Sequence, residues 1–350
     1  MRRLVALACA LAALPATAQA AQLPVGRPVT IAWGGDTTLG SSYGVPGDNG
    51  FAALAGVAGL LRAADISAIN VEGTFGSGGA SKCGGGQSPT CFAFQAPARN
   101  ASALRRAGVD VANLANNHAF DFGATGMGQT VRALRANKVR VTGRPGEITV
   151  LSVPGARVAF VGFASYRWSA PLNDHARVRA LCREASKRAN VVVAFFHGGA
   201  EGADRTHVPR GNEHYLGEDR GDLRTFARAA IDGGADLVLG SGPHVLRGME
   251  RYHKRLIAYS LGNLAGFHNF ATGGVLARSG IVRVTIGSGG ELMGGRFESL
   301  ALDGAGIPRR DASGASAQMV SSLSREDFGA SAVTVAGDGT LSFPGAAPAR

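Results

Sequence analysis

The chain has 350 residues, of which 45% are apolar and 17% charged, and its formal net charge is +11. The apolar fraction excludes a globally disordered chain, and the length suffices for one large domain with a small extension or for two modest domains. The basic balance favours an acidic partner such as a polyanionic polymer, an anionic cell envelope or nucleic acid, although scattered arginines also fit a merely solvated basic surface.

The first 20 residues have the pattern of a secretory signal peptide. Arg2 and Arg3 form a short positive segment, Leu4–Leu14 is an apolar run, and Ala18-Gln19-Ala20 is typical of a cleavage site. The apolar run is too short for a comfortable membrane span. We therefore expect the mature chain to begin at Ala21 and to work outside the cytoplasm, either secreted or periplasmic.

The following part of the chain alternates short apolar strands with amphipathic helices. Strands are predicted over residues 29–33, 66–71 and 109–114, and helices over residues 51–64, 97–107 and 126–136. This alternation predicts an α/β fold with a parallel sheet and crossover helices. Ligands of such sheets bind beyond the carboxyl ends of the strands.

Three cysteines follow the predicted signal peptide. Cys83 and Cys91 flank a glycine-rich loop. In an oxidising compartment this pair predicts a local disulfide, and two free thiols are the alternative. Cys182 lies on the apolar face of a predicted helix, so we expect it to be a buried thiol.

The pattern changes in the second half of the chain. Residues 148–153 and 158–163 predict a hairpin, and a helix over residues 174–189 precedes the most apolar strand, residues 191–196. Further strands are predicted near residues 237–239, 247–252, 256–260, 281–286 and 292–302. The predicted organisation is a signal peptide (1–20), a main domain (21–303) and a peripheral Ala/Gly-rich extension (304–350) with weak strands near residues 333–335 and 341–343.

Five predicted strands are followed by polar side chains that suit a divalent transition metal, namely Asp36, Glu72, Asn117, His197 and His244. A carboxylate such as that of Glu72 can bridge two ions about 3.5–4 Å apart, as in two-metal hydrolytic sites. Each residue alone also has an ordinary explanation as a turn, cap, loop or core residue. The prediction of a metal site therefore depends on the whole set.

Two neighbours of Asn117 suit acid catalysis. His118 can protonate a leaving group, and Asp121 is placed to hold that imidazole in one tautomer. Glu201 is a possible further ligand or an orienting group for His197.

Six blocks in order carry a family resemblance: Gly35-Asp36-Thr-Thr-Leu, Asn70-Val-Glu72-Gly, Ala115-Asn-Asn-His-Ala-Phe-Asp-Phe-Gly123, His197-Gly-Gly-Ala-Glu201, Gly240-Ser-Gly-Pro-His244-Val and Ser260-Leu-Gly-Asn263. Together they resemble the CapA family, which is linked to capsular poly-γ-glutamate synthesis. The resemblance covers about residues 28–285. It implies the fold of calcineurin-like metallophosphoesterases, a four-layer α/β/β/α sandwich. It also implies metal positions at Asp36, Glu72, Asn117, His197 and His244, a catalytic imidazole at His118, and an auxiliary place for Asn263.

Two positions depart from the pattern of these families. Thr38 stands where ordinary metallophosphoesterases carry a histidine, and Gly242 replaces the first histidine of the fifth block. We expect a divalent ion (Mn, Zn or Fe), either as one tightly and one weakly held ion, or with Glu201 or a loop histidine compensating for the missing imidazoles.

The sequence thus predicts a metal-dependent hydrolase that makes, releases or remodels an anionic envelope polymer such as polyglutamate. In this hypothesis a metal-activated water attacks a phosphoester or an amide, and His118 protonates the leaving group. The alternative is a non-catalytic polymer-binding protein or an accessory of envelope polymer-synthase components, which Thr38 and Gly242 favour. A nucleic-acid partner is supported by charge alone, because no recognition motif is present.

Overall fold

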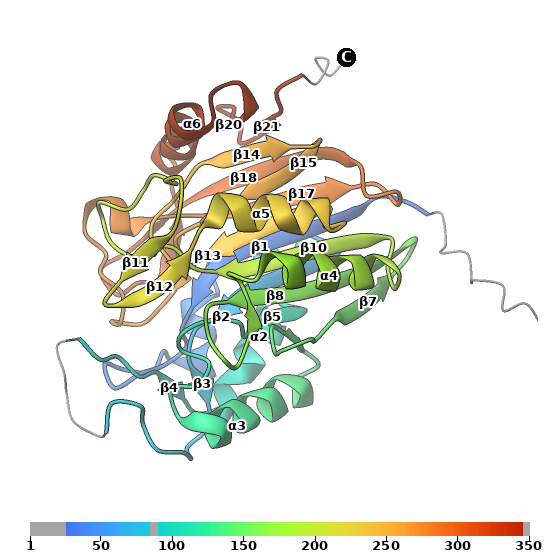
Figure 1. Ribbon diagram of the computed structural model, residues 1–350. Helices are drawn as coiled ribbons and strands as arrows, with labels where there is room; N and C mark the ends of the chain where they lie inside the picture. Colours follow the sequence, from blue (N-terminus) through green and yellow to red (C-terminus); the bar gives the residue numbers. More distant parts are fainter. Residues whose placement is uncertain (1–25, 85–89, 346–350) are drawn as a thin grey trace, which may run out of the picture.

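The structure, a computed structural model, describes residues 26–84 and 90–345 and contains two large β-sheets (Figure 1). The predicted signal peptide lies outside the described residues. The first sheet has eight strands: β1 (Val29–Thr37), β2 (Ile66–Val71), β5 (Val111–Asn113), β6 (Arg140–Thr142), β16 (Asn263–Ala265), β17 (Arg278–Ile286), β18 (Leu292–Leu302) and β19 (Pro308–Arg310). Their order is β19-β18-β17-β1-β2-β5-β6, and β16 pairs with the end of β1. The strands β1, β2, β5 and β6 are parallel, as the alternating pattern predicts.

The second sheet has nine strands: β7 (Thr149–Val153), β8 (Ala156–Ala164), β9 (Ala170–Pro171), β10 (Val191–His197), β13 (Leu237–Ser241), β14 (Met249–Tyr252), β15 (Arg255–Ala258), β20 (Ala332–Val335) and β21 (Leu341–Ser342). Their order is β21-β20-β14-β15-β13-β10-β8-β7, and β9 pairs with β8. The predicted hairpin is the antiparallel pair β7–β8. The central strands β8, β10 and β13 are parallel and almost entirely buried, which explains their continuous apolar runs.

Three apolar clusters separate four layers. One lies between the first sheet and its helices α1 (Ala58–Arg62), α2 (Ala101–Ala107) and α3 (Gly123–Ala136). The second lies between the sheets, where the rings of Trp33 and Phe195 stack 4.5 Å apart. The third lies between the second sheet and its helices α4 (His175–Ser186) and α5 (Leu223–Asp232). The predicted four-layer α/β/β/α sandwich is confirmed (Figure 1).

Local sequence explains where several helices begin and end. The Asp174 and Asp222 side chains accept hydrogen bonds from backbone N–H groups in the first turns of α4 and α5, which fixes both starts. Gly108 ends α2 in the left-handed conformation, at φ +99°. The helix predicted over residues 51–64 is broken into a 3₁₀ segment, Asp48–Ala53, and the short α1. Glycines in this stretch weaken a continuous helix, and Gly50 adopts φ +90°.

The C-terminal part of the chain contains a helix that the sequence pattern did not reveal. This helix, α6 (Ala315–Phe328), contacts β14 and β20 of one sheet and β17 and β18 of the other (Figure 1). Its buried face carries serines among its apolar residues, and the hydroxyls of Ser316 and Ser324 donate to backbone carbonyls. Because serines replace apolar residues on this buried face, the apolar periodicity that would indicate a helix is weak in the sequence. The two weak strands predicted nearby are present as β20 and β21.

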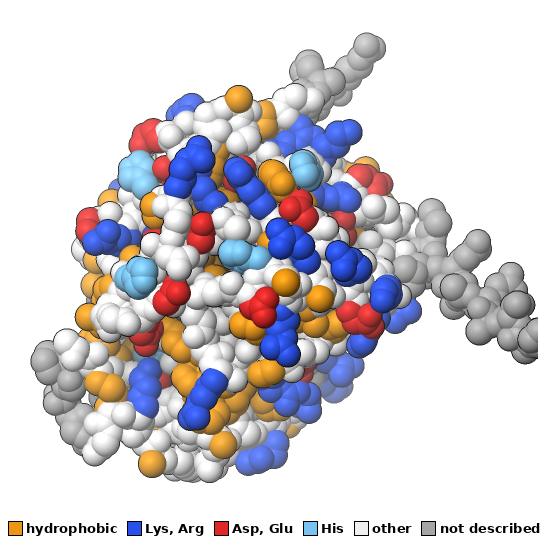
Figure 2. All heavy atoms as spheres, in the orientation of Figure 1, with side chains coloured by type: hydrophobic (Ala, Val, Ile, Leu, Met, Phe, Trp, Pro, Cys, Tyr) orange, Lys and Arg blue, Asp and Glu red, His pale blue; other side chains and the backbone are white. Residues whose placement is uncertain are grey.

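Two further short sheets flank the carboxyl ends of the central strands. They are β3 (Thr74–Phe75) with β4 (Gln95–Ala96), and β11 (Glu213–Tyr215) with β12 (Glu218–Gly221). Among the helices in the described ranges, none combines the length and apolar character that a membrane crossing needs. Figure 2 shows lysine and arginine side chains scattered over the visible face among acidic ones, rather than gathered into one block.

Candidate metal centre

Both sheets contribute side chains to one cluster at the carboxyl ends of their central strands. Asp36 lies near the end of β1, and Glu72 follows β2. His197 ends β10, and His244 lies three residues beyond β13. Because parallel strands end at the same edge, the fold itself brings these residues to one place.

The distances within the cluster are those of side chains that converge on a common point. One ligand atom each of Asp36, Glu72 and His197 lie within 4.8 Å of one another. His244 faces the same two carboxylates, with Nδ1 3.4 Å from Asp36 Oδ2 and Nε2 3.7 Å from Glu72 Oε1. Asp36, Glu72 and His197 are buried, and His244 is mostly buried.

Several polar atoms in this cluster lack a hydrogen-bond partner among the described residues. In the cluster these atoms are both carboxylate oxygens of Glu72 and Nε2 of His197, and the side-chain oxygen of Asn117, on the loop after β5, likewise has no partner. Burying such atoms without partners is costly, and native proteins avoid it unless an ion or water satisfies them. Carboxylate, imidazole and amide oxygen are also the donor types that divalent transition metals accept. The residues present therefore fit a metal ion.

Neighbouring groups fix the orientation of the proposed ligands. Asn70 Nδ2 donates to Asp36 Oδ1 at 2.7 Å and lies 3.2 Å from His197 Nδ1. Asn263 Oδ1 lies 2.7 Å from His244 Nδ1. With the Nδ1 proton held by Asn263, Nε2 of His244 is the nitrogen that can act as a ligand. Asn263 is therefore placed to orient His244 rather than to hold an ion itself.

The pKa values of the two carboxylates, Asp36 and Glu72, are shifted in opposite directions. Burial raises the pKa of Asp36, but hydrogen bonds and the charges of His197 and His244 outweigh it and hold that pKa well below its ordinary value. Burial and the charge of Asp36 raise the pKa of Glu72 well above 4.5. Burial lowers the pKa of His244, but the charges of Glu72, Glu201 and Asp36 outweigh burial and raise it well above 6.5. Two carboxylates this close are both charged most easily beside a cation.

The two positions that lack the expected histidines have structural uses. The Thr38 hydroxyl donates to the Glu72 backbone carbonyl at 2.8 Å, which anchors the backbone of that residue. Gly242 adopts φ +119°, and a Cβ there would lie 2.6 Å from the Gly198 carbonyl oxygen. Its N–H donates to Asp36 Oδ2 at 3.2 Å. Neither position supplies a ligand, and Gly242 has no room for a side chain.

Glu201 lies beside the cluster. Its Oε2 is 3.6 Å from His244 Nε2, and its Oε1 is 2.9 Å from a guanidinium nitrogen of Arg220. Burial raises the pKa of Glu201, but the charges of His244 and Arg220 outweigh burial and lower it. Glu201 is thus an anionic carboxylate beside His244. The buried Arg220 that holds it was not recognised from the sequence, because a lone arginine in a polar loop carries no motif.

His118 and Asp121 form a pair next to the cluster. His118 Nδ1 lies 2.8 Å from Asp121 Oδ2, and Asp121 is completely buried. His118 and its neighbour Asn117 line a cavity of about 390 Å³ together with Glu201 and Arg220. Asn117 and His118, both on the loop after β5, therefore line the same cavity, whereas the buried Asp121 is not among its lining residues.

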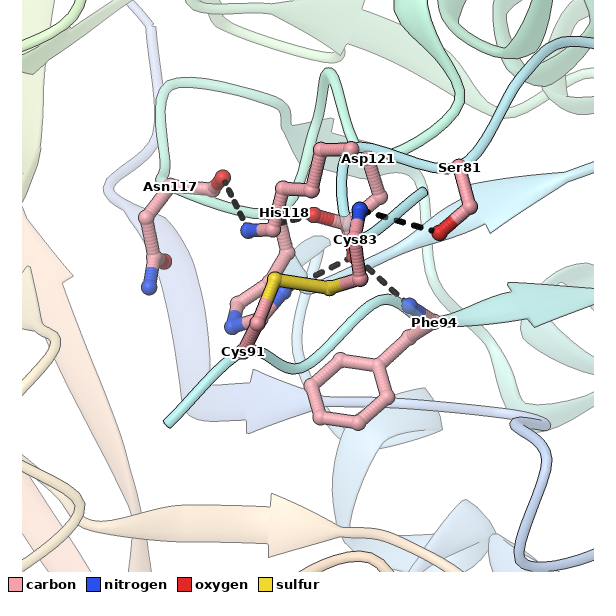
Figure 3. The surroundings of a disulfide bond; sticks show 8 residues. Ser81, Cys83, Cys91, Phe94, Asn117, His118 and Asp121 are labelled. Atoms are coloured by element: carbon pink, nitrogen blue, oxygen red, sulfur yellow. Dashed lines mark hydrogen bonds and ion pairs between the residues drawn. A yellow bond between two sulfur atoms is a disulfide. The ribbon is translucent and has the colours of Figure 1, made fainter. Parts of the chain in front are cut away.

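The cysteines are as the sequence predicts. Cys83 and Cys91 form a disulfide beside the His118 loop (Figure 3), so the alternative of two free thiols is wrong. Cys182 is a free, buried thiol. The cavity is lined by residues beside the disulfide (Lys82, Thr90, Cys91 and Phe92), by the His118 loop and by the β11–β12 hairpin, and its wall also includes the aromatic side chains of Tyr166 and Trp168.

Comparison with known proteins identifies relatives of this chain. Residues 30–267 match the family described as bacterial capsule synthesis protein PGA_cap. The chain is 31% identical over 182 residues to the capsule biosynthesis protein CapA of Bacillus anthracis, covering 46% of this chain and 41% of that protein. It is 30% identical over 211 residues to the PGA biosynthesis protein CapA of Bacillus subtilis (strain 168), covering 55% of this chain and 50% of that protein. The chain thus spans at most half the length of these relatives.

Solved structures resemble the chain more distantly. A 5'-nucleotidase precursor from Thermus thermophilus matches 85% of this chain and 59% of its own, with 16% identity and a TM-score of 0.43. NAD nucleotidase of Haemophilus influenzae matches 86% of this chain and 56% of its own, with 11% identity and a TM-score of 0.41.

Proposed function

Because this chain belongs to the family of bacterial capsule synthesis proteins PGA_cap, we propose that it is an extracytoplasmic, metal-dependent hydrolase of an anionic envelope polymer. The observation that supports the proposal is the convergence of Asp36, Glu72, His197 and His244 from two sheets, in which buried atoms of Glu72 and His197 have no hydrogen-bond partner among the described residues. Structural carboxylates and imidazoles at a sheet edge would instead be hydrogen-bonded to one another or to backbone groups.

These four side chains, with Asn117, would hold one or two divalent ions, and Glu201, beside His244, would be a further ligand. A bound ion would supply Lewis acidity and a water nucleophile usable near neutral pH. The protein's own part is to fix the ligand orientations through Asn70 and Asn263 and to exclude most water from the cluster.

His118 is the proposed proton donor to the leaving group. Asp121 engages Nδ1 of the imidazole, so Nε2 is the nitrogen left to reach a substrate in the cavity that His118 lines. Asp121 acts through His118 by holding its tautomer and ring orientation, because its carboxylate is completely buried and cannot reach the substrate itself.

The basic net charge favours an anionic substrate, such as polyglutamate or a phosphate-linked polymer. The bond cleaved would be a phosphoester or an amide. Envelope polymer-synthase components are proposed partners, since CapA of Bacillus subtilis is named as a PGA biosynthesis protein.

Turnover of small substrates tests the proposal. The purified protein is assayed on bis(p-nitrophenyl) phosphate and on a γ-glutamyl p-nitroanilide, with EDTA and with added Mn²⁺ or Zn²⁺. We expect metal-dependent turnover of at least one substrate and a loss of about 10²-fold or more for His118→Ala. His253→Ala, which removes an exposed imidazole outside the proposed site, is the matched control and should retain activity. Equal rates with EDTA and with metal would refute the proposal.

A non-catalytic accessory role is the second candidate. The absence of imidazoles at Thr38 and Gly242 favours it, because the ligand set then has fewer strong donors. Binding of polyglutamate by the metal-loaded protein, without cleavage of the polymer or of either small substrate, would support this role and exclude hydrolysis.

A further inference from the structure

The proposed acid pair is held from two sides by the segments that flank the disulfide (Figure 3). On one side, Lys82 Nζ lies 2.7 Å from Asp121 Oδ1 and donates to the Asn117 backbone carbonyl at 3.3 Å. On the other side, the Phe94 backbone N–H donates to Asp121 Oδ2 at 2.6 Å. The two oxygens of one buried carboxylate are thus held by two separate segments of chain.

Phe94 also contacts the imidazole itself. Its ring centroid lies 4.4 Å from that of His118, and its backbone carbonyl accepts from the Thr74 N–H at 2.9 Å, which ties this segment to β3. On the other side, the Lys82 N–H donates to the Asp121 backbone carbonyl at 2.8 Å. His118 is therefore confined by Asp121 at Nδ1 and by the Phe94 ring against its face.

The disulfide connects these two segments. Cys83 follows Lys82 directly, and Cys91 lies three residues before Phe94. Apart from the disulfide, the two sides contact the acid pair independently. A covalent link next to both contacts fixes their separation, and so limits the positions that the Asp121 carboxylate and the His118 ring can take.

We propose that Lys82 and Phe94 are positioning residues for the His118–Asp121 pair, and that the Cys83–Cys91 disulfide keeps them in place, so that full activity requires the oxidised loop. This inference rests on the proposed role of His118 as proton donor. It gives the disulfide a functional use, and it couples catalysis to an oxidising compartment.

The test compares wild type with Cys83→Ser/Cys91→Ser and with Lys82→Met. Lys82→Met keeps the disulfide and removes the ammonium group that contacts the Asp121 carboxylate and the Asn117 backbone carbonyl. Lys187→Met is the matched control, because Lys187, which directly follows α4, forms an exposed ion pair with Glu184. All four proteins are compared for metal content, thermal midpoint, kcat and KM. We expect kcat of both test variants to fall about tenfold or more, with KM and metal content little changed, since general acid catalysis typically contributes about 10²–10⁴-fold.

A second readout does not depend on turnover. The ring-nitrogen NMR signals of His118 are recorded in ¹⁵N-histidine-labelled, zinc-loaded protein and assigned with His118→Ala. We expect them to shift or broaden in the two test variants, while those of His253 stay unchanged in all four proteins. If the His118 signals of the two test variants match those of wild type, the inference is overturned. It is also overturned if those signals change while the kcat of the variants stays at the wild-type value. If wild type itself shows no turnover, the proposed function fails, and the NMR signals alone decide whether the loop positions His118.

Discussion

Replacing Glu72 by glutamine should stabilise the metal-free protein while removing most of the stabilisation that metal provides. Glu72 is completely buried, and neither of its carboxylate oxygens has a hydrogen-bond partner in the described structure. Burial and the charge of Asp36 raise its pKa well above 4.5, so the charged form opposes folding when no cation is present. Glutamine has nearly the same shape and no charge, which relieves this repulsion.

The metal-dependent part of the effect can be estimated from linkage. At a free metal concentration 100 times Kd, an ion that binds only the folded wild type stabilises it by about 2.7 kcal/mol. For a chain of this size, that corresponds to a rise in Tm of about 4 °C. If Glu72→Gln weakens binding about 100-fold, the same concentration equals Kd, and the stabilisation falls to about 0.4 kcal/mol, or about 0.5 °C.

The assay is thermal unfolding of EDTA-treated protein before and after addition of Mn²⁺ or Zn²⁺. Glu184→Gln, an exposed carboxylate on α4, is the matched control and should respond to metal as wild type does. The pH dependence gives a further check. Because the folded-state pKa of Glu72 is raised, the metal-free wild type should lose stability relative to Glu72→Gln as pH rises above 4.5, and the two should converge at lower pH. A metal-free variant less stable than wild type at pH 7 would show that the carboxylate is satisfied without an ion.

Three other predictions follow from single residues. Gly242→Ala should lower stability by about 2 kcal/mol or more in urea unfolding, because φ is +119° and the new Cβ would lie 2.6 Å from a backbone oxygen; a loss below about 0.5 kcal/mol would contradict this. Hydrogen bonds from Ser313, Ser316 and Ser299 outweigh burial and lower the pKa of Asp311 to about 2. The stability that the Asp311 carboxylate contributes is therefore fully present above pH 3.8 and is lost as the pH falls through 2. The difference in urea midpoint between wild type and Asp311→Asn should therefore shrink from pH 5 to pH 2, and a constant difference would refute the assignment. Burial raises the pKa of Cys182 to about 12, so iodoacetamide at pH 8 should label Cys182 only after unfolding, as peptide mapping will show; labelling of the native protein would contradict its burial.

The strand-end residues were predictable from the sequence because their chemistry and their place depend on local pattern. Asp36, Glu72, His197 and His244 each follow an apolar run, and parallel strands bring their carboxyl ends to one edge. The same reasoning applies to the loop from Asn117 to Asp121, whose internal contact between His118 and Asp121 spans only three residues. Short-range spacing was sufficient for both.

The contacts that complete the site join segments that are distant in the sequence, so no local sequence pattern indicates them. Arg220 forms an ion pair with Glu201 across a loop, and Lys82 forms one with Asp121, which lies 39 positions further along the chain. In the sequence, Arg220 and Lys82 resemble ordinary surface cations. Gly242 is the clearest case. Its sequence pattern indicates only a missing histidine, whereas the structure shows that the Gly198 backbone occupies the space where its side chain would be.

Helix α6 escaped prediction for a related reason. Its buried face includes Ser316, Ser321 and Ser324, whose hydroxyls bond to carbonyls of β18, of β20 and of α6 itself. Such a face is buried by specific hydrogen bonds rather than by apolar periodicity alone, and two of the three partners lie outside the helix, in β18 and β20.

The most direct test of the metal centre is a crystal structure of the protein grown with Zn²⁺, with anomalous data collected at the zinc edge. The arrangement of side chains predicts at least one strong anomalous peak, about 2.0–2.2 Å from Glu72, Asp36 and His197 or from Glu72 and His244. Peaks confined to surface histidines, with Glu72 and His197 contacting only protein or water, would contradict a metal centre at this edge of the two sheets.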